Sequence, residues 1–515
     1  MTVEYDTTGK IDVVRSTMEE LVAAMKRGET TSEALVLEYL SRIEANDKQG
    51  LELQAILEIA PREKLLKAAR KLDEERRNGR TRSKLHGLAL LLKDCIATGP
   101  ELGMETTAGT NALLGCKPAV NAELVENLLK AGILVIGKSN MTVLNGALGA
   151  GLRSGWSPRG GQTKTAYGKF DPGGSSTGSA VGTSEGFCSA GIGAETDGSL
   201  VSPSRVAALY GLKPTVGLVS VKGVIGITPK QDSLGPICKS PWDVAALLSI
   251  LVTTPHDYTQ YTSAPHVDLS SYRLGIPRIN FEADKHGSDV DTFPDVPALE
   301  ADARKLFDLA LDKLRAAAAA VVDPADIPGA GDLGKVQDDS QGEWVGKRDL
   351  PFCVDAYEQY QAYFRDLRGG SITTLEDLIE WHDAHPEQSF IDPSNPARQS
   401  FLEHTAYTKG KPVKGYEESL AKLQVITDNV LATLDKDDLD ALVFPSGFGG
   451  AGTWAAHMAA PGGLPIATVP IGLLSNGEPF GLYIIARRHD EGKLLSIMSA
   501  CERLFPARAV PPNSR

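Results

Sequence analysis

Hydrophobic residues recur at the spacing of an α-helix through the first 85 residues of the chain. Met18, Leu21 and Met25 fall at i, i+3 and i+7, which places them on one helical face. The segment GETTSEALVLEYLSRI repeats this pattern, and residues 61–80 form a charged amphipathic stretch. These patterns predict three helices, and we expect residues 1–85 to form an N-terminal helical segment that packs on the rest of the chain.

Two positions carry the start signal of a helix. Ser16 lies three residues before Glu19, and Thr30 lies three residues before Glu33. In a capping box the hydroxyl accepts a hydrogen bond from the N–H three residues on, and the acidic side chain accepts one from the N–H of the hydroxyl residue. The spacing therefore predicts Ser16 and Thr30 as the N-caps of the first two helices.

From about residue 86 the pattern changes to short apolar runs that alternate with helical stretches. The runs at 88–94 and 133–138 have the length of buried strands, and the amphipathic stretch 122–132 lies between them. Apolar runs return in LDALVFPS, LPIATVPIGLL and GLYIIAR, before a helix expected from Glu491. Strands separated by helices form parallel or mixed sheets with covered faces. We predict an α/β fold with a single large mixed β-sheet core covered by helices on both faces.

Residues 256–410 differ in composition from the segments on either side. They contain Pro-rich and acidic stretches, an alanine-rich stretch at 306–322 that predicts a helix, and the aromatic helical stretch AYEQYQAYFRDL. We therefore treat residues 86–515 as one domain and residues 256–410 as a variable insertion within it.

The charge balance excludes several classes of partner. The formal net charge is −13 and no basic block is present, which argues against nucleic acids and anionic membrane surfaces as partners. No run approaches the ~18 apolar residues that a membrane-spanning helix needs. The N-terminal MTVEYDTTGKIDVV lacks the basic and apolar regions of a signal peptide. We expect a cytoplasmic protein.

No pattern of metal or cofactor ligands stands out. The six cysteines are scattered without a CxxC pair, and the nine histidines include no HExxH motif. The glycine-rich GALGAGLRSG lacks the strand and helix context of a dinucleotide site. We expect reduced thiols, no metal and no organic cofactor.

A lysine ends the apolar run at 88–94. The commoner role of such a residue as Lys93 is a strand-end lysine whose amine reaches solvent. Burial beside Leu91 and Leu92 instead disfavours the ammonium form, lowers the pKa of the lysine and makes its amine a usable base. Adjacent residues of a strand point to opposite faces, so Asp94 is expected to face away from that amine.

Two serine-containing segments follow the lysine. Ser175 and Ser176 lie in PGGSSTGSA, which fits either an ordinary Gly/Ser turn or a loop whose hydroxyls relay protons. Ser199 lies in ETDGSLVSPS, just before an expected helix. It fits either a helix N-cap or a nucleophile on a tight turn whose N–H groups converge on one oxygen.

Taken together, the three segments resemble the amidase signature family. HGLALLLKD, DPGGSSTGSA and ETDGSL occur in the family's order, and Ser175 and Ser199 are 24 residues apart, as is characteristic of the family. The wording SGWSPRGGQ together with ETDGSLV is closest to the branch that contains peptide amidases.

The resemblance implies a catalytic role for each segment. By position, Ser199 matches the nucleophile, Ser175 the bridging serine after a cis peptide bond, and Lys93 the base. The amides that match the family's oxyanion hole are those of Thr196, Asp197, Gly198 and Ser199. The residues that match its supporting positions are Ser176 and Gly174.

The resemblance also implies a reaction. Residues 86–515 become a catalytic domain whose 256–410 insertion shapes the substrate pocket. The expected activity is hydrolysis of a carboxamide through an acyl-enzyme, releasing ammonia or an amine. The expected substrate is a small-molecule or peptide amide, including a C-terminal peptide amide, and the expected state is a monomer or homodimer.

Other members of the family offer alternatives. One is the amide-hydrolysing component of a glutamine-dependent amidotransferase, its GatA-type protein; others are a carbamate, fatty-amide or aryl-amide hydrolase, and a non-catalytic binding module. Two positions depart from the common family pattern. Val201 stands where an arginine is frequent, which argues against the amidotransferase, and Cys95 replaces an asparagine as either a packed residue or a reactive thiol.

Overall fold

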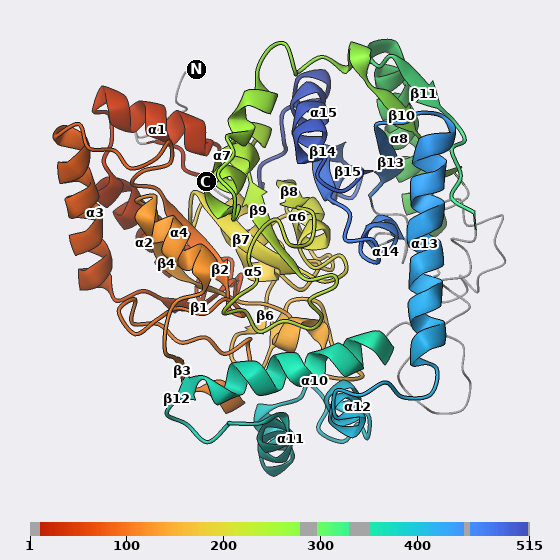
Figure 1. The fold of residues 1–515 in the computed structure, drawn as a ribbon. Coiled ribbons are helices and arrows are strands. Elements are labelled where there is room, and N and C mark those ends of the chain that lie inside the picture. The colour runs from red at the N-terminus through yellow and green to blue at the C-terminus, as the bar shows by residue number, and fades with distance from the viewer. Residues whose placement is uncertain (1–10, 279–295, 329–349, 447–453, 513–515) are drawn as a thin grey trace.

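The structure is a computed structural model that describes residues 11–278, 296–328, 350–446 and 454–512 (Figure 1). Residues 1–10 of the N-terminal segment lie outside the described residues, as do 279–295 and 329–349 of the insertion at 256–410.

The three helices expected in residues 1–85 are present and lie together along one side of the molecule (Figure 1). They are α1 (Met18–Arg27), α2 (Ser32–Asn46) and α3 (Arg62–Arg77). Met18, Leu21 and Met25 are buried, as the helical spacing predicts. A short strand, β1 (Ile56–Ile59), follows α2 and joins the central sheet.

The predicted N-caps are each wrong by one residue. Thr17 rather than Ser16 caps α1: its Oγ1 accepts a hydrogen bond from the Glu20 N–H, and the Glu20 carboxylate accepts one from the Thr17 N–H. Thr31 rather than Thr30 caps α2, with its Oγ1 accepting from the N–H three residues on. Adjacent hydroxyl and acidic residues give two overlapping matches to the capping spacing, so the sequence alone does not choose between them.

A large mixed sheet forms the core, as predicted. Eleven strands of the described residues pair in the order β1-β4-β2-β7-β9-β8-β14-β15-β13-β10-β11. β2 pairs in parallel with β4 and β7, whereas β9 pairs antiparallel with β7 and β8. The strands after β1 are β2 (Ala89–Lys93), β4 (Leu134–Ser139), β7 (Ala190–Glu195), β8 (Tyr210–Lys213), β9 (Ser233–Cys238), β10 (Arg273–Gly275), β11 (Ala320–Val322), β13 (Ala441–Pro445), β14 (Ile466–Leu473) and β15 (Pro479–Ile485).

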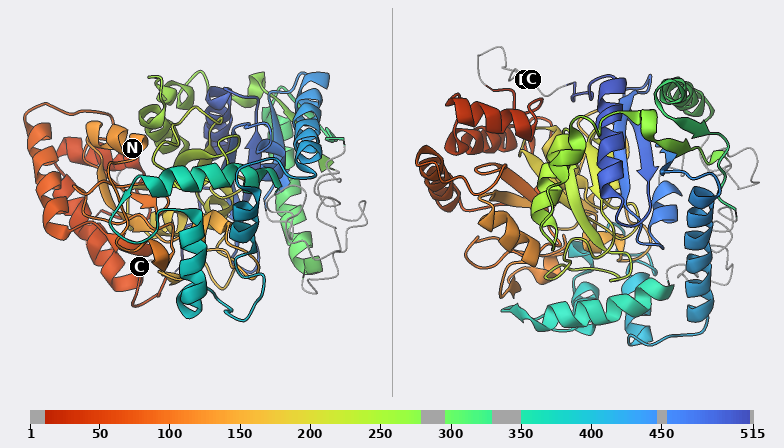
Figure 2. Two further views of the ribbon diagram at one scale, coloured as in Figure 1. Left: turned by 60° about the horizontal axis from the view of Figure 1, so that its bottom comes forward. Right: turned by 45° about the horizontal axis from the view of Figure 1, so that its top comes forward.

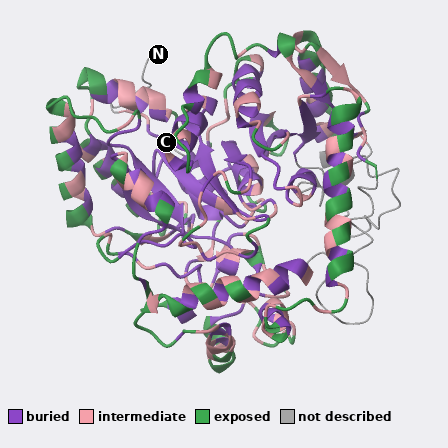
Figure 3. Cartoon of the chain, viewed as in Figure 1, coloured by how far each residue is buried: buried purple, intermediate pink, exposed green. Residues whose placement is uncertain are grey.

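Helices cover both faces of this sheet (Figures 1 and 2), and the central strands are buried almost throughout (Figure 3). α5 contacts α6, and α7 contacts α15. The helices after α3 are α4 (Glu123–Lys130), α5 (Thr177–Ser184), α6 (Val201–Val206), α7 (Pro241–Leu251), α8 (Val296–Ala317), α10 (Leu350–Arg365), α11 (Leu375–Ala384), α12 (Ser400–Thr408), α13 (Tyr416–Lys436), α14 (Trp454–Ala459) and α15 (Glu491–Leu504). Two small sheets pair β3 (Lys117–Pro118) with β12 (Leu367–Arg368), and β5 (Trp156–Ser157) with β6 (Gly161–Gln162).

The region 256–410 contributes to the central sheet as well as to its surroundings. β10 and β11 form one edge of the eleven strands, and α10 to α12 lie together below the sheet in Figure 1. The helix expected over 306–322 is wrong at its end: α8 stops at Ala317, and 320–322 form β11. Val321 and Val322 are β-branched and pair in parallel with β10, so the sheet overrides the alanine-rich helical pattern there.

Candidate active site

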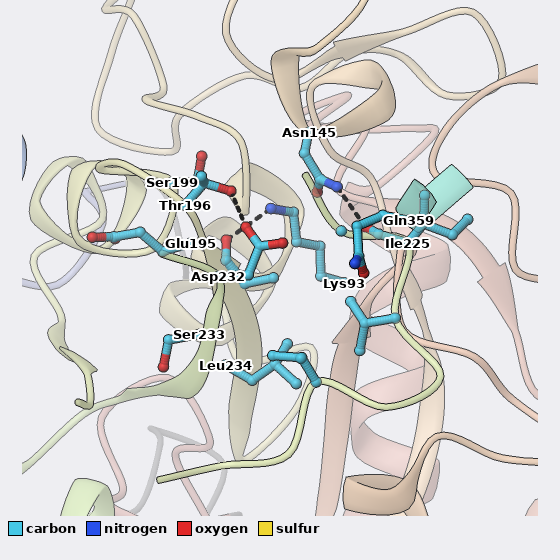
Figure 4. A pocket seen from close by; sticks show the side chains of 14 residues that line it. Lys93, Asn145, Glu195, Thr196, Ser199, Ile225, Asp232, Ser233, Leu234 and Gln359 are labelled. Atoms are coloured by element: carbon cyan, nitrogen blue, oxygen red, sulfur yellow. Dashed lines mark hydrogen bonds between the residues drawn. The ribbon is translucent and has the colours of Figure 1, made fainter. Parts of the chain in front are cut away.

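The three segments singled out in the sequence meet at one edge of the central sheet. Lys93 is the last residue of β2 and Glu195 is the last residue of β7, its parallel neighbour. β9 begins at the same edge with Ser233, because it runs antiparallel to β7. A narrow pocket with about 380 Å³ of empty space opens here, and Lys93 and Ser199 both line it (Figure 4).

Lys93 is fully buried, and its surroundings favour the neutral amine. Its Nζ lies 2.8 Å from Ser175 Oγ and 2.9 Å from the Ala194 carbonyl oxygen, and donates a hydrogen bond to each. Burial lowers the pKa of Lys93 to about 8, while Cys95, Asp232 and Glu195 act in the opposite direction from further away. The sequence alternative of a solvent-reaching lysine therefore does not hold.

Asp94 faces away from this amine, as the strand alternation predicts. Its Oδ2 accepts hydrogen bonds from the N–H and hydroxyl of Thr107 and from the Gly109 N–H. Its Oδ1 lies 3.3 Å from Nζ of Lys138, a second buried lysine on the neighbouring strand β4. Asp94 therefore fixes the end of β2 without contacting the Lys93 amine.

Ser175 and Ser176 belong to a loop that is bound on both sides. A cis peptide bond joins Gly174 to Ser175. The Ser176 N–H donates to the Ser199 carbonyl oxygen at 2.8 Å, and Ser176 Oγ donates to the Ala194 carbonyl oxygen at 3.1 Å. These two bonds tie the glycine-serine loop to β7 and to the turn that carries Ser199. A flexible Gly/Ser turn is therefore the wrong description of this segment.

The turn 196–199 connects β7 to α6. Gly198 has a φ of 85°, a left-handed conformation that favours glycine. The Glu195 carboxylate accepts hydrogen bonds from the N–H groups of Leu200 and Val201 and so satisfies the start of α6. Ser199 therefore does not act as the N-cap of α6. Its side chain is half-buried and lines the pocket.

Asp232 is a pocket residue that the sequence did not single out. Its Oδ1 accepts a 2.5 Å hydrogen bond from the Thr196 hydroxyl, and its Oδ2 accepts from the N–H groups of Ile227 and Thr228 (Figure 4). Burial raises the pKa of Asp232 to about 6, partly offset by these hydrogen bonds and by Lys93. The residue precedes the apolar run of β9, but nothing in that pattern separates it from an ordinary loop aspartate.

Three further residues around the pocket come from distant segments. Asn145 and Gln359 line it, and Gln359 belongs to α10 within the region 256–410. His457 of α14 is hydrogen-bonded through Nδ1 to Asp197 Oδ1 at 2.7 Å, on the turn that carries Ser199. No sequence motif pointed to these three side chains, because only the folded chain brings their segments together.

The two departures from the family pattern are both buried. Val201 is the first residue of α6 and is packed in the core. Cys95 is fully buried, and burial raises the pKa of its thiol to about 11, which keeps the sulfur protonated and unreactive. Cys95 is therefore a packed small residue.

The described residues contain no group of three or more His, Cys, Asp or Glu side chains arranged to hold a metal ion. Among the helices of those same residues, none combines the length and apolar character required to cross a membrane.

Comparison with known proteins places this site in context. A family model described as Amidase matches residues 34–328. A probable amidase of Arabidopsis thaliana is 30% identical over 504 residues, covering 97% of this chain and 92% of that protein. The solved structure of a peptide amidase from Stenotrophomonas maltophilia is 32% identical, with a TM-score of 0.83, and the match covers 97% of this chain and 99% of that one.

The relatives also include a component of the glutamyl-tRNA(Gln) amidotransferase of Thermoanaerobacter pseudethanolicus. It is 26% identical over 521 residues, covering 96% of this chain and 97% of that protein. The match to the family model spans more than half of the chain, and the similarity to individual members extends over nearly all of it. The chain accordingly belongs to the amidase family and is an amide-hydrolysing enzyme with the amidase signature fold.

Proposed function

We propose that the chain hydrolyses a carboxamide through an acyl-enzyme on Ser199, with Ser175 and Lys93 as the proton relay. The observation that carries this proposal is the 2.8 Å hydrogen bond between the fully buried Lys93 amine and Ser175 Oγ, in the pocket that Ser199 lines. A serine hydroxyl is a weak nucleophile until an adjacent base removes its proton.

The relay has a simple sequence of bonds. The proton of Ser199 Oγ passes to Ser175 Oγ as the Ser175 proton passes to Lys93 Nζ, and Ser199 Oγ bonds to the substrate carbonyl carbon. The C–N bond then breaks, and the proton returns along the same path to the leaving nitrogen, which departs as ammonia or an amine. Water repeats the attack on the acyl-enzyme and releases the acid.

The environment of Lys93 suits this task at neutral pH. With a pKa of about 8, roughly one lysine in ten is neutral at pH 7. With its ordinary pKa of 10.5, only about one in several thousand would be. Burial therefore increases the fraction of competent base by about two orders of magnitude.

We propose that the backbone N–H groups of Thr196, Asp197, Gly198 and Ser199 form the oxyanion hole. Their turn is held by the Thr196 hydroxyl on Asp232 and by His457 on Asp197. Fixed N–H groups stabilise the developing negative charge on the carbonyl oxygen without having to reorganise during the reaction. Ser176 and Gly174 act as supports of the opposing loop.

We propose a peptide or small-molecule carboxamide as substrate, with a C-terminal peptide amide as the first candidate. The support is the extended similarity to the peptide amidase of Stenotrophomonas maltophilia, at 32% identity. A role as the corresponding component of a glutamyl-tRNA(Gln) amidotransferase is the second candidate, because that relative too matches over nearly its full length, at 26% identity. Carbamates, fatty amides and aryl amides complete the range.

We further propose that the enzyme acts in the cytoplasm as a monomer or homodimer, without metal or organic cofactor. The six free cysteines, all buried, fit a reducing compartment. We treat 1–85 as a helical segment on a catalytic domain 86–515, and Gln359 supports a role of the region 256–410 in shaping the pocket.

Covalent labelling and a substrate panel test the proposal. A fluorophosphonate should modify one residue, Ser199, as located by peptide mapping, and Ser199→Ala should abolish both labelling and turnover. Ser270→Ala, at an exposed serine, is the matched control and should keep both. A panel of C-terminally amidated peptides, aryl amides, fatty amides and glutamine then ranks the substrates. Labelling elsewhere, or a Ser199→Ala enzyme with near wild-type turnover, contradicts the assignment.

A further inference from the structure

The side chain of Asn145 is a polar group in the pocket that the proposed relay does not use. It belongs to a short 3₁₀ turn, Val143–Gly146, and lines the same pocket as Ser199 and Lys93. In Figure 4 it enters the pocket from the side opposite Ser199. The two residues therefore face the space that a substrate would occupy from different walls.

The orientation of the Asn145 amide is fixed by one hydrogen bond. Its Nδ2 donates to the Ile225 carbonyl oxygen at 2.8 Å. The reverse orientation would bring two oxygen atoms together, so Oδ1 is the end that points away from Ile225. This Oδ1 is buried and has no hydrogen-bond partner among the described residues.

The backbone around Asn145 is held in an uncommon conformation. Leu144, Asn145 and Gly146 have consecutive positive φ values of 50°, 60° and 88°. A bulky residue such as Leu144 rarely adopts this region, whereas asparagine and glycine tolerate it. The Leu144 N–H donates to the Ala108 carbonyl oxygen at 2.9 Å, which helps to hold the turn. Such conformations persist where the surroundings enforce them, and they are concentrated at binding sites.

The chemistry around Oδ1 defines its complement. Val221, Val224 and Ile225 form an apolar wall of the pocket. A carbonyl oxygen in such a place needs a donor, because a buried acceptor without one loses the hydrogen bonds that water would supply. A carboxamide or peptide substrate brings N–H groups at its scissile amide and along its acyl chain, whereas an ester has none on its leaving group.

We propose that Asn145 is a specificity-determining residue whose Oδ1 accepts a hydrogen bond from an N–H of the substrate. This inference rests on the proposed function, since it assumes that the substrate carbonyl reaches Ser199. It selects amides that carry a free N–H and places that N–H on the wall opposite the nucleophile. Asn145 itself takes no part in proton transfer.

The test pairs one enzyme variant with three substrates that share an acyl group. Asn145→Gly removes the carboxamide and keeps the positive φ without strain. Asp438→Gly is the matched control, because Asp438 is an exposed residue with a φ of 49° outside the pocket. The substrates are an N-acyl amino acid amide, the methyl ester of the same acid, and the amide methylated on its acyl N–H.

A hydrogen bond to Asn145 should appear as a coupling between the two changes. Asn145→Gly should lower kcat/KM for the parent amide about tenfold and leave the Asp438→Gly control unchanged. If the leaving N–H is the donor, the variant loses nothing on the ester. If the acyl N–H is the donor, the variant loses nothing on the N-methylated amide.

Two results would overturn the inference. One is an equal loss on all three substrates, which would show a structural effect of the turn, and the other is no loss on any of them. Fluorophosphonate labelling of Ser199 in the Asn145→Gly enzyme separates this outcome from a failure of the proposed function. Labelling that persists leaves the nucleophile in place whatever the role of Asn145.

Discussion

Two buried lysines lie on neighbouring strands of the central sheet and have different surroundings. Lys93 ends β2, and Lys138 lies on β4, which pairs with β2 in parallel. Both side chains are fully buried. The oxygens that Lys93 Nζ contacts, Ser175 Oγ and the Ala194 carbonyl oxygen, carry no net charge.

Lys138 instead has an anion at its amine. Its Nζ donates to the Ile96 carbonyl oxygen and to Thr106 Oγ1 and lies 3.3 Å from Asp94 Oδ1. Burial lowers the pKa of both lysines, but the adjacent carboxylate of Asp94 favours the ammonium form of Lys138. The comparison teaches that burial alone does not produce a base: the amine must also lack a carboxylate at contact distance.

The sharpest way to break this comparison is to replace Lys93. Lys93→Ala should lower kcat/KM by about 10⁴-fold or more, because the relay loses its base. Lys93→Arg should not restore activity, since the guanidinium stays charged and cannot accept a proton. Steady-state kinetics and circular dichroism measure activity and fold, with Lys222→Ala at an exposed position as control. An active Lys93→Arg enzyme with an unchanged pH profile would give Lys93 a structural role only.

Replacing Lys138 should affect stability more than chemistry. Lys138→Met removes the cation beside Asp94 and leaves a buried carboxylate with a weaker partner, Arg159 at 3.7 Å. We expect the free energy of unfolding to fall by about 3 kcal/mol. Urea denaturation measures this loss, and Lys222→Met controls for the loss of a lysine as such. An unchanged midpoint and slope would show that the pair contributes little to the fold.

The pH profile sharpens the comparison further. Below a pKa of about 8 Lys93 is an ammonium and the relay is blocked, so kcat/KM should rise with pH through an apparent pKa near that value. The Asp232 carboxylate favours the ammonium and raises the pKa of Lys93.

Asp232→Asn should therefore move the midpoint to lower pH by a few tenths of a unit. The neutral amide still offers an oxygen acceptor to the neighbouring N–H groups. Asp257→Asn, a carboxylate change outside the pocket, should leave the midpoint in place. A shift of the Asp232→Asn midpoint to higher pH would contradict the assignment of Lys93 as the titrating base.

The smallest effect is expected at Cys95. Its thiol is buried and its pKa is raised to about 11, so iodoacetamide should leave it unmodified in the native enzyme and label it after unfolding. Cys95→Ala should keep kcat/KM within about twofold of the wild type, because the sulfur takes no part in the relay. Mass spectrometry of the labelled peptide measures its accessibility. Rapid labelling with loss of activity in the native state would make Cys95 a reactive thiol.

Much of this architecture could be predicted from local pattern. The spacing of Met18, Leu21 and Met25 predicts the buried face of α1, and the apolar run before Lys93 becomes β2. Periodicity works here because each face of a helix or strand meets one environment over its whole length. It fails at 320–322, where pairing with β10 turns an alanine-rich stretch into a strand.

The amino-acid sequence by itself determined the order of the elements and the three segments that meet at the pocket, because their motifs are continuous in the chain. Only the tertiary structure decided the surroundings of each group. Asn145, Asp232 and His457 come from separate segments, and the loss of water and of charged neighbours at Lys93 depends on strands that are distant in the chain. Hydrogen bonding and desolvation act through space, so a linear pattern records which groups exist but not which of them end up without water or a counter-ion.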